Sequence, residues 1–252
     1  MKRAAFAFLL SLQAALGHAQ TSGALAPAAD PWKRPRTPSA LDDEFDGAAL
    51  LPKWSILQPS GLTAAVARGL LKLTGTTHAG DIVQGPYQDI PSGGSTPFTC
   101  AVHIRHHSKF GSSTQYGTSG ILLVQDMAAP STTDLVSFGP VVSDDNNYGD
   151  YLGLYVGKFS KFDTNDGTNP HRRAAFLPNA LFLRVRRSGT TWYFDYSADG
   201  TAWIQVHTMA ESFTAKQIGV FVDNNNTGQN VSAYFDFFRF KAADDDGPLW
   251  GW

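Results

Sequence analysis

Apolar and polar residues alternate one by one along several short stretches of the chain. In the stretch 100–105, the residues at 100, 102 and 104 are Cys, Val and Ile, whereas His103 and Arg105 occupy alternate positions. The stretch 181–186 repeats this alternation, with Arg184 and Arg186 opposite a row of Leu and Val. A period of two is typical of an antiparallel strand that buries one face, and no helical pattern extends beyond a turn or two. The pattern therefore predicts an all-β protein.

Strand-like runs recur along the chain, with turn residues between them. The expected strands are 66–73, 99–105, 120–125, 135–142, 151–156, 181–187, 191–196, 202–206, 218–222 and 232–241. Gly189 lies between two of these runs and Gly200 lies between the next two, so both glycines mark hairpin turns. This succession of strands and turns predicts a two-sheet antiparallel β-sandwich of the jelly-roll type.

The two ends of the chain differ in composition from this strand-rich part. Residues 1–19 carry Lys2 and Arg3 before an apolar stretch, which predicts a secretory signal peptide or, alternatively, the assembly arm of a virion protein. Residues 20–40 form a Pro/Ala-rich linker, and residues 242–252 form an acidic-aromatic tail. We therefore expect the sandwich domain to span 41–241, and we expect no transmembrane segment, since no apolar run is long enough.

Charge and composition narrow the possible functions of the chain. The net charge is −2 and the pI is about 6.4, so the protein lacks the basic surplus that general nucleic-acid binding needs. The acids are almost all Asp, and a catalytic glutamate pair would have to combine Glu44 with Glu211. The single cysteine, Cys100, is expected to be a small buried side chain without a disulfide partner.

Three segments, taken in order, resemble the concanavalin A-like lectin/glucanase superfamily. They are 41–54, the hairpin 183–203 that ends in Ser-Ala-Asp-Gly-Thr-Ala-Trp, and the pair of runs 218–222 and 234–240. The closest resemblance is to the sandwich domains appended to family 43 β-xylosidases. It implies a curved two-sheet sandwich that commonly binds ligands on its concave sheet. This fold hosts lectins, hydrolases, lyases and phage structural domains, so it does not imply one function.

The resemblance also bears on catalysis and on metal binding. The glucanase branch of the superfamily needs a strand with Glu-x-Asp-x-Glu, and the chain contains no such segment. We therefore predict no catalytic residues. Some members hold a structural calcium ion between the first and last strands, and the nearest matches to its ligands are Asp43, Asp46 and Asp236. No other cofactor is expected.

The outward positions of the expected strands suggest a sugar-binding surface. The candidate residues are His103, Arg105, Gln125, Tyr151, Tyr155, Arg184 and Arg186. Aromatic rings offer flat apolar faces to a sugar, and Arg and Gln offer planar hydrogen-bonding groups to its hydroxyls. We expect the two tyrosines to share one sheet face with the histidine and the arginines. The competing interpretation is an ordinary solvated face whose Arg and Tyr stems cover apolar surface.

Together these features predict an exported, non-catalytic carbohydrate-recognition or accessory module that is secreted or periplasmic and binds a glycan or polysaccharide. One alternative is a structural or attachment protein of a virion, in which residues 1–40 serve assembly with a partner or with further copies of the chain. The other alternative is a glycoside hydrolase or lyase with an unrecognised site.

Overall fold

The computed structural model describes most of the chain from residue 38 onward. The described residues are 38–57, 61–76, 80, 82–110, 116–129, 132–145, 149–166, 171–172, 181–210, 213–224 and 230–249. The predicted signal peptide or assembly arm, 1–19, and most of the linker lie outside them. Among the residues described, no helix is both long enough and apolar enough to span a membrane.

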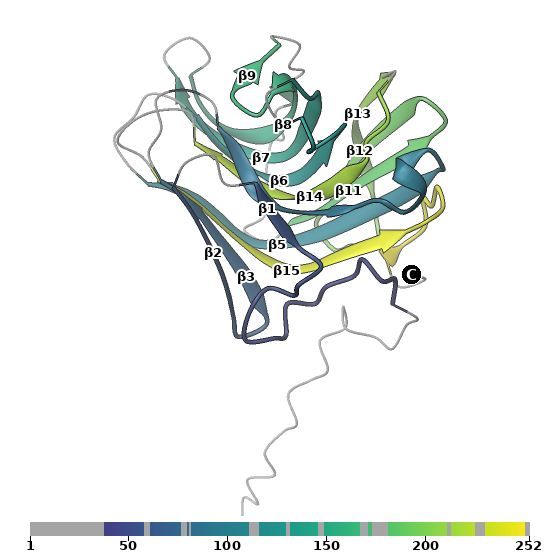
Figure 1. Cartoon of the computed structure of the whole chain (residues 1–252). Coiled ribbons are helices and arrows are strands. Elements are labelled where there is room, and N and C mark those ends of the chain that lie inside the picture. Colours follow the sequence, from purple (N-terminus) through teal and green to yellow (C-terminus); the bar gives the residue numbers. More distant parts are fainter. Residues whose placement is uncertain are drawn as a thin grey trace, which may run out of the picture. The chain divides into compact units, whose positions relative to one another are not determined.

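The described residues form two antiparallel sheets (Figure 1). The larger sheet contains, in spatial order, β1 (Ser55–Leu57), β4 (Val83–Asp89), β14 (Gln217–Asn224), β6 (Tyr116–Val124), β7 (Leu135–Asp145), β8 (Gly149–Lys161) and β10 (His171–Arg172), and β9 (Thr164–Asn165) pairs with β8. The smaller sheet contains β13 (Ile204–Ala210), β12 (Thr191–Ser197), β11 (Leu181–Ser188), β5 (Phe98–Phe110), β15 (Asn230–Lys241), β3 (Leu70–Gly75) and β2 (Leu62–Ala67). The predicted all-β, two-sheet antiparallel sandwich is confirmed.

The main core lies between the two sheets and follows the predicted alternation. On β5, Cys100, Val102 and Ile104 face this core, and on β11 the residues at 181, 183 and 185 do the same. On β6 the predicted parity was wrong: Gln125 was expected at an outward position, yet Leu123, which has the same parity, packs in the core. Both faces of β6 are apolar, so alternation alone could not decide which one is buried between the sheets.

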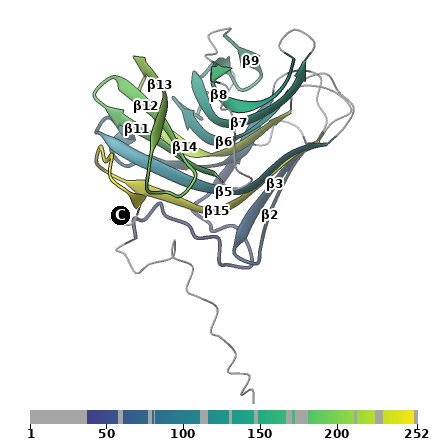
Figure 2. The ribbon, with the colours of Figure 1, turned by 180° about the vertical axis from the view of Figure 1, so that it is seen from behind.

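A second apolar cluster covers the other face of the eight-stranded sheet. Its buried members are Leu57, Val83, Leu122, Val124, Leu135, Phe159 and Phe221. The two sheets curve in the same sense, and this face is the concave one that points away from the seven-stranded sheet (Figures 1 and 2). The concave face is therefore partly apolar, as a surface that binds a ligand ring requires.

Among the elements that the sequence pattern misjudged are a hairpin and a central strand of the larger sheet. The expected strand 66–73 is a hairpin, in which β2 turns into β3 through Arg68 (φ 55°) and Gly69 (φ 73°). Strand β4 was not expected at all, because Gly85 and Pro86 interrupt its apolar pattern. β4 nevertheless pairs with β1 on one side and β14 on the other, and it carries the candidate site described below.

A half-buried histidine between the two sheets is expected to make the stability of the fold depend on pH. His107 of β5 makes a 2.8 Å hydrogen bond between its Nδ1 and the Ser119 hydroxyl of the opposite sheet. Burial lowers the pKa of His107 to about 4. The unfolded chain therefore binds a proton that the folded protein rejects as the pH falls below about 6.5, so folding stability decreases toward acid.

We expect the free energy of unfolding to fall by about 2 kcal/mol between pH 7 and pH 4 through His107 alone. This is less than the free energy that corresponds to the full pKa difference, because the residue is only half-buried. Urea titrations of wild type and His107→Gln at both pH values measure this contribution. His106→Gln is the matched control, because the neighbouring His106 is exposed. A wild-type pH dependence that persists unchanged in His107→Gln would contradict the assignment.

Candidate functional site

The seven residues predicted to bind sugar do not form one surface. Tyr151 and Tyr155 lie on β8, and Gln125 follows β6, so these three belong to the eight-stranded sheet. His103 and Arg105 lie on β5, and the two arginines of β11 lie beside them on the seven-stranded sheet. The expectation of a shared face was wrong, because alternation assigns a residue to a face of its strand and does not assign the strand to a sheet.

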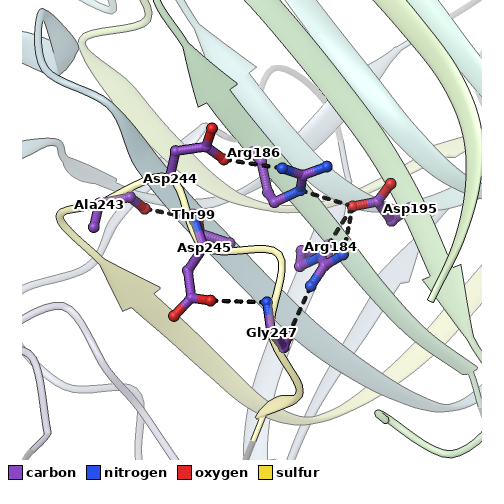
Figure 3. Close-up of polar contacts among 8 residues, drawn as sticks. All are labelled: Thr99, Arg184, Arg186, Asp195, Ala243, Asp244, Asp245 and Gly247. Carbon is purple, nitrogen blue, oxygen red and sulfur yellow. Dashed lines mark hydrogen bonds and ion pairs between the residues drawn. The ribbon is translucent and has the colours of Figure 1, made fainter. Parts of the chain in front are cut away.

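On the outer face of the seven-stranded sheet, the two arginines of β11 are engaged in internal contacts (Figure 3). Arg184 and Asp195 of β12 are both 2% exposed and lie 2.9 Å apart. Arg186 contacts the same carboxylate and also Asp244 of the C-terminal tail, at 3.1 Å and 3.0 Å. The tail also supplies the carbonyl oxygen of Gly247, which accepts a hydrogen bond from Arg184. These side chains therefore hold the tail against the sheet.

The other two candidates on this face are engaged in a similar way. His103 Nδ1 lies 3.1 Å from Asp236 Oδ2, and the guanidinium of Arg105 lies 3.3 Å from the same oxygen. The His103 ring stacks on Phe182, with ring centroids 4.0 Å apart and planes 3° apart. His103 is buried, so the ring offers no open face to a ligand.

Of the candidates on the eight-stranded sheet, Tyr155 is buried and Gln125 is half-buried. Tyr155 points away from the main core, as its strand parity predicted, but it is only 1% exposed and its hydroxyl accepts a hydrogen bond from Asn165. The expectation of Tyr155 as an open stacking platform was therefore wrong. Gln125 accepts a hydrogen bond from the backbone N–H of Asp134. The side chain of Tyr151 lies outside the described residues.

The three aspartates proposed as calcium ligands do not form a cluster. Asp43 accepts hydrogen bonds from Trp54 Nε1 and from the backbone N–H of Phe45. Asp236 pairs with His103 and Arg105 as described above, and Asp46 is exposed. Within the described part of the chain, no group of three or more His, Cys, Asp or Glu residues is placed to hold a metal ion. In the described residues these three aspartates are therefore not brought together as one set of ligands, and calcium binding stays a prediction.

A pocket of about 310 Å³ lies at one end of the concave sheet. Its lining residues are Lys53, Ser55, Tyr87, Gln88, Asp89, Met127, Ala128 and Gln217. β1 pairs with β4 only as far as Tyr87, so the two residues that follow in β4 extend past the end of β1. Sequence reasoning missed this site because it did not recognise β4, and the only signal was the Tyr-Gln-Asp run itself.

A chain of hydrogen bonds fixes the polar wall of the pocket. The backbone N–H of Met127 donates to Gln217 Oε1 at 3.0 Å, and Gln217 Nε2 donates to Asp89 Oδ1 at 2.9 Å. An ion pair between Lys216 and Asp126, whose charged atoms lie 2.5 Å apart, holds the turn that carries Met127. Asp89 is exposed, and its second oxygen is free to accept a hydrogen bond from a ligand.

Two further lining residues set the chemistry of the pocket. Gln88 is 2% exposed, and its Nε2 donates to the carbonyl oxygen of Leu41 at 2.9 Å, whereas its Oε1 has no hydrogen-bond partner. Lys53 donates to the carbonyl oxygens of Ala40 and Asp42, and burial lowers its pKa. The pocket therefore presents the exposed carboxylate of Asp89 beside the half-buried ring of Tyr87, whereas Gln88 Oε1 is enclosed by protein.

Comparisons with known proteins place the fold. No protein-family model and no curated protein matches the chain. Among solved structures, it is similar to the GH43 protein BlXynB of Bacillus licheniformis, with a TM-score of 0.57 and 16% identity over 83% of this chain and 40% of that one. The exoplasmic/lumenal domain of VIP36 gives a TM-score of 0.53 and 10% identity over 77% of this chain and 86% of that one. The chain has a concanavalin A-like fold.

A functionally unknown protein from Saccharomyces cerevisiae shares this concanavalin A-like architecture, with a TM-score of 0.54 and 14% identity over 77% of this chain and 98% of that one. At such identities the similarity shows the fold alone. The chain spans about 40% of the length of the GH43 protein, so the similarity concerns one part of that molecule. The sequence resemblance to concanavalin A-like domains is confirmed at this level.

Proposed function

We propose that the protein is a non-catalytic carbohydrate-binding sandwich and that a sugar ring occupies the pocket beside Tyr87. The observation that carries the proposal is the combination of one half-buried aromatic ring with the fixed polar groups of Asp89 and Gln217. A sugar presents an apolar ring face and a rim of hydroxyls, and this pocket offers a partner to each. Its volume of about 310 Å³ is at the small end of the range for ligand sites.

The structural neighbours support a saccharide ligand. One of them is a GH43 protein, another is a xylan β-1,4-xylosidase from Bacillus halodurans with a TM-score of 0.51, and VIP36 was solved in a Ca²⁺/Man3GlcNAc-bound form. These names describe those proteins. For this chain they favour a sugar over other small ligands that an aromatic ring and a carboxylate would accept.

The lining of the pocket favours binding over hydrolysis. Glycoside hydrolysis commonly uses a pair of carboxyl groups about 5–9.5 Å apart. Asp89 is the one carboxylate among the residues that line this pocket. Glu44, one of the two glutamates of the chain, is engaged in a two-pronged contact with Arg239 at 3.0 Å and 3.2 Å.

We also propose that the protein is exported, to the periplasm or the medium, with residues 1–19 as its signal peptide. The support is the basic start and apolar stretch of these residues. Mass spectrometry of the protein purified from its native host tests this: a mature N-terminus near Gln20 is expected, and an intact Met1 would favour an assembly arm instead.

The ligand proposal is tested by glycan-array screening of the wild type, followed by calorimetric titration of the best oligosaccharide. Tyr87→Ala is expected to weaken binding roughly ten-fold, because a stacking contact contributes about 0.5–1.5 kcal/mol beyond its buried area. Tyr234→Ala is the matched control, since Tyr234 lies on the seven-stranded sheet beside His106 and Lys72.

Circular dichroism confirms that each variant is folded before titration. Binding that is unchanged in folded Tyr87→Ala, or that is lost equally in Tyr234→Ala, would contradict the assignment of the pocket. A wild type that binds no glycan on the array and none at millimolar concentration in solution would contradict the proposed function itself.

A further inference from the structure

We infer that the edge strand β2 pairs with the same strand of a second copy of the chain. In the described residues, the seven-stranded sheet ends at β2 and β13, and the eight-stranded sheet ends at β1 and β10 (Figure 1). An edge strand presents a row of backbone N–H and C=O groups, which can pair with another strand unless the sequence prevents it. The four edges differ in how well the sequence prevents such pairing.

Three of these edges carry features that discourage pairing. β1 has three residues and β10 has two in the described part of the chain, so neither offers a long row of backbone groups. β13 is bulged, because its register with β12 shifts after Phe194 and leaves Val206 as an extra residue. A bulge bends an edge strand and twists it away from a regular partner.

β2 lacks each of these features. Its sequence is Leu-Thr-Ala-Ala-Val-Ala, without proline or a charged side chain, and its register with β3 is continuous over all six residues. The side chains of Thr63, Ala65 and Ala67 are small and exposed. Two identical strands in an antiparallel pair place the same side chains close together, so a charged strand would repel its copy and this one does not. These properties favour a second copy of the chain as the partner.

The turn between β2 and β3 decides which backbone groups point outward. Arg68 and Gly69 form a two-residue turn at positive φ, and such a turn makes its flanking residues a hydrogen-bonded pair. Hydrogen-bonded pairs recur at every second residue, so the backbone groups of Ala64 and Val66 point away from β3, toward the open edge. If Ala64 of each copy pairs with Val66 of the other, the two Ala65 residues lie opposite each other.

This pairing has a consequence for the proposed sugar pocket. Antiparallel neighbours in one sheet are related by a two-fold axis perpendicular to the sheet, so the concave faces of both copies lie on the same side of the dimer. Two pockets then face one polysaccharide, and binding to a polysaccharide surface gains from avidity. This consequence rests on the proposed function, whereas the dimer itself does not.

Sedimentation velocity of the purified protein, over roughly 1 to 500 µM, tests the dimer without any sugar. We expect an equilibrium between monomer and dimer with a Kd on the order of 10 µM, because one pair of short strands makes a small interface. Ala65→Lys is expected to weaken the dimer at least about ten-fold, since it places two ammonium groups opposite each other. Thr208→Lys is the matched control, because Thr208 is exposed on the other edge of the same sheet.

Disulfide trapping tests the register of the pairing. Opposed residues of a non-hydrogen-bonded pair have Cα atoms about 4.5 Å apart, a distance that a disulfide can span. Oxidised glutathione is therefore expected to cross-link Ala65→Cys into a dimer and to leave Thr208→Cys monomeric, while the native Cys100 is buried and does not compete. A wild type that stays monomeric over the whole concentration range, or equal behaviour of the β2 and β13 variants, would overturn the inference. A dimeric wild type that binds no sugar would count against the proposed function alone.

Discussion

Replacing Asp195 with alanine is expected to lower the free energy of unfolding by about 3–5 kcal/mol. Asp195 and Arg184 are each 2% exposed, and the carboxylate also contacts Arg186 (Figure 3). Removing the carboxylate leaves the Arg184 guanidinium buried between the Trp203 ring, 4.2 Å from its centroid, and the C-terminal tail. A buried charge without its counterion is far less stable than the same charge in water.

Urea-induced unfolding of wild type and Asp195→Ala measures this effect. Asp244→Ala is the matched control: it removes the other carboxylate that contacts Arg186, but Asp244 is partly exposed, so a loss of at most about 1 kcal/mol is expected. Losses of similar size in the two variants would contradict the account of this face as a buried, charge-balanced layer beneath the tail.

Replacing Trp192 with alanine is also expected to lower the free energy of unfolding by about 3–5 kcal/mol, because the lost ring leaves a cavity. Trp192 of β12 is fully buried, with the rings of Phe98 and Phe213 each 5.8 Å from it. The guanidinium of Arg187 lies over the Trp192 ring, 5.3 Å from its centroid. In a closely packed core the neighbours of a deleted ring fill only part of the space that it leaves, so a cavity remains.

Trp192→Phe separates the packing of the ring from its polar group. The indole N–H is buried without a hydrogen-bond partner, so Phe removes an unsatisfied donor while it retains most of the apolar contact. Thermal unfolding is expected to show a much smaller loss for Phe than for Ala, about 1–2 kcal/mol. A loss for Phe as large as that for Ala would contradict this account of the core.

Much of the fold could be predicted because burial imposes a period of two on each strand. The alternation at His103 and Arg105, and at Arg184 and Arg186, placed these side chains correctly on the faces of their strands. Turn residues were equally informative: Gly189 and Gly200 both adopt positive φ, at 60° and 69°, between the strands that they were expected to connect.

The candidate site could not be predicted in the same way. Alternation does not tell which strands become neighbours, and Tyr155 therefore seemed to belong with arginines that lie on the other sheet. It also cannot tell whether an outward residue is later covered, as Arg184 is by the tail. The pocket depends on β4, whose Gly85 and Pro86 disguise a strand, and on the contact of Gln217 with Asp89 across 128 residues of sequence.

The most direct test of the central claim is to locate a bound oligosaccharide on the protein. Backbone amide chemical shifts measured by NMR during titration with the oligosaccharide that binds best would report its position. The account predicts that the largest changes occur at Tyr87, Asp89, Met127 and Gln217, at the end of the concave sheet. Changes centred on the outer face of the seven-stranded sheet, around His103 and Arg184, would contradict it.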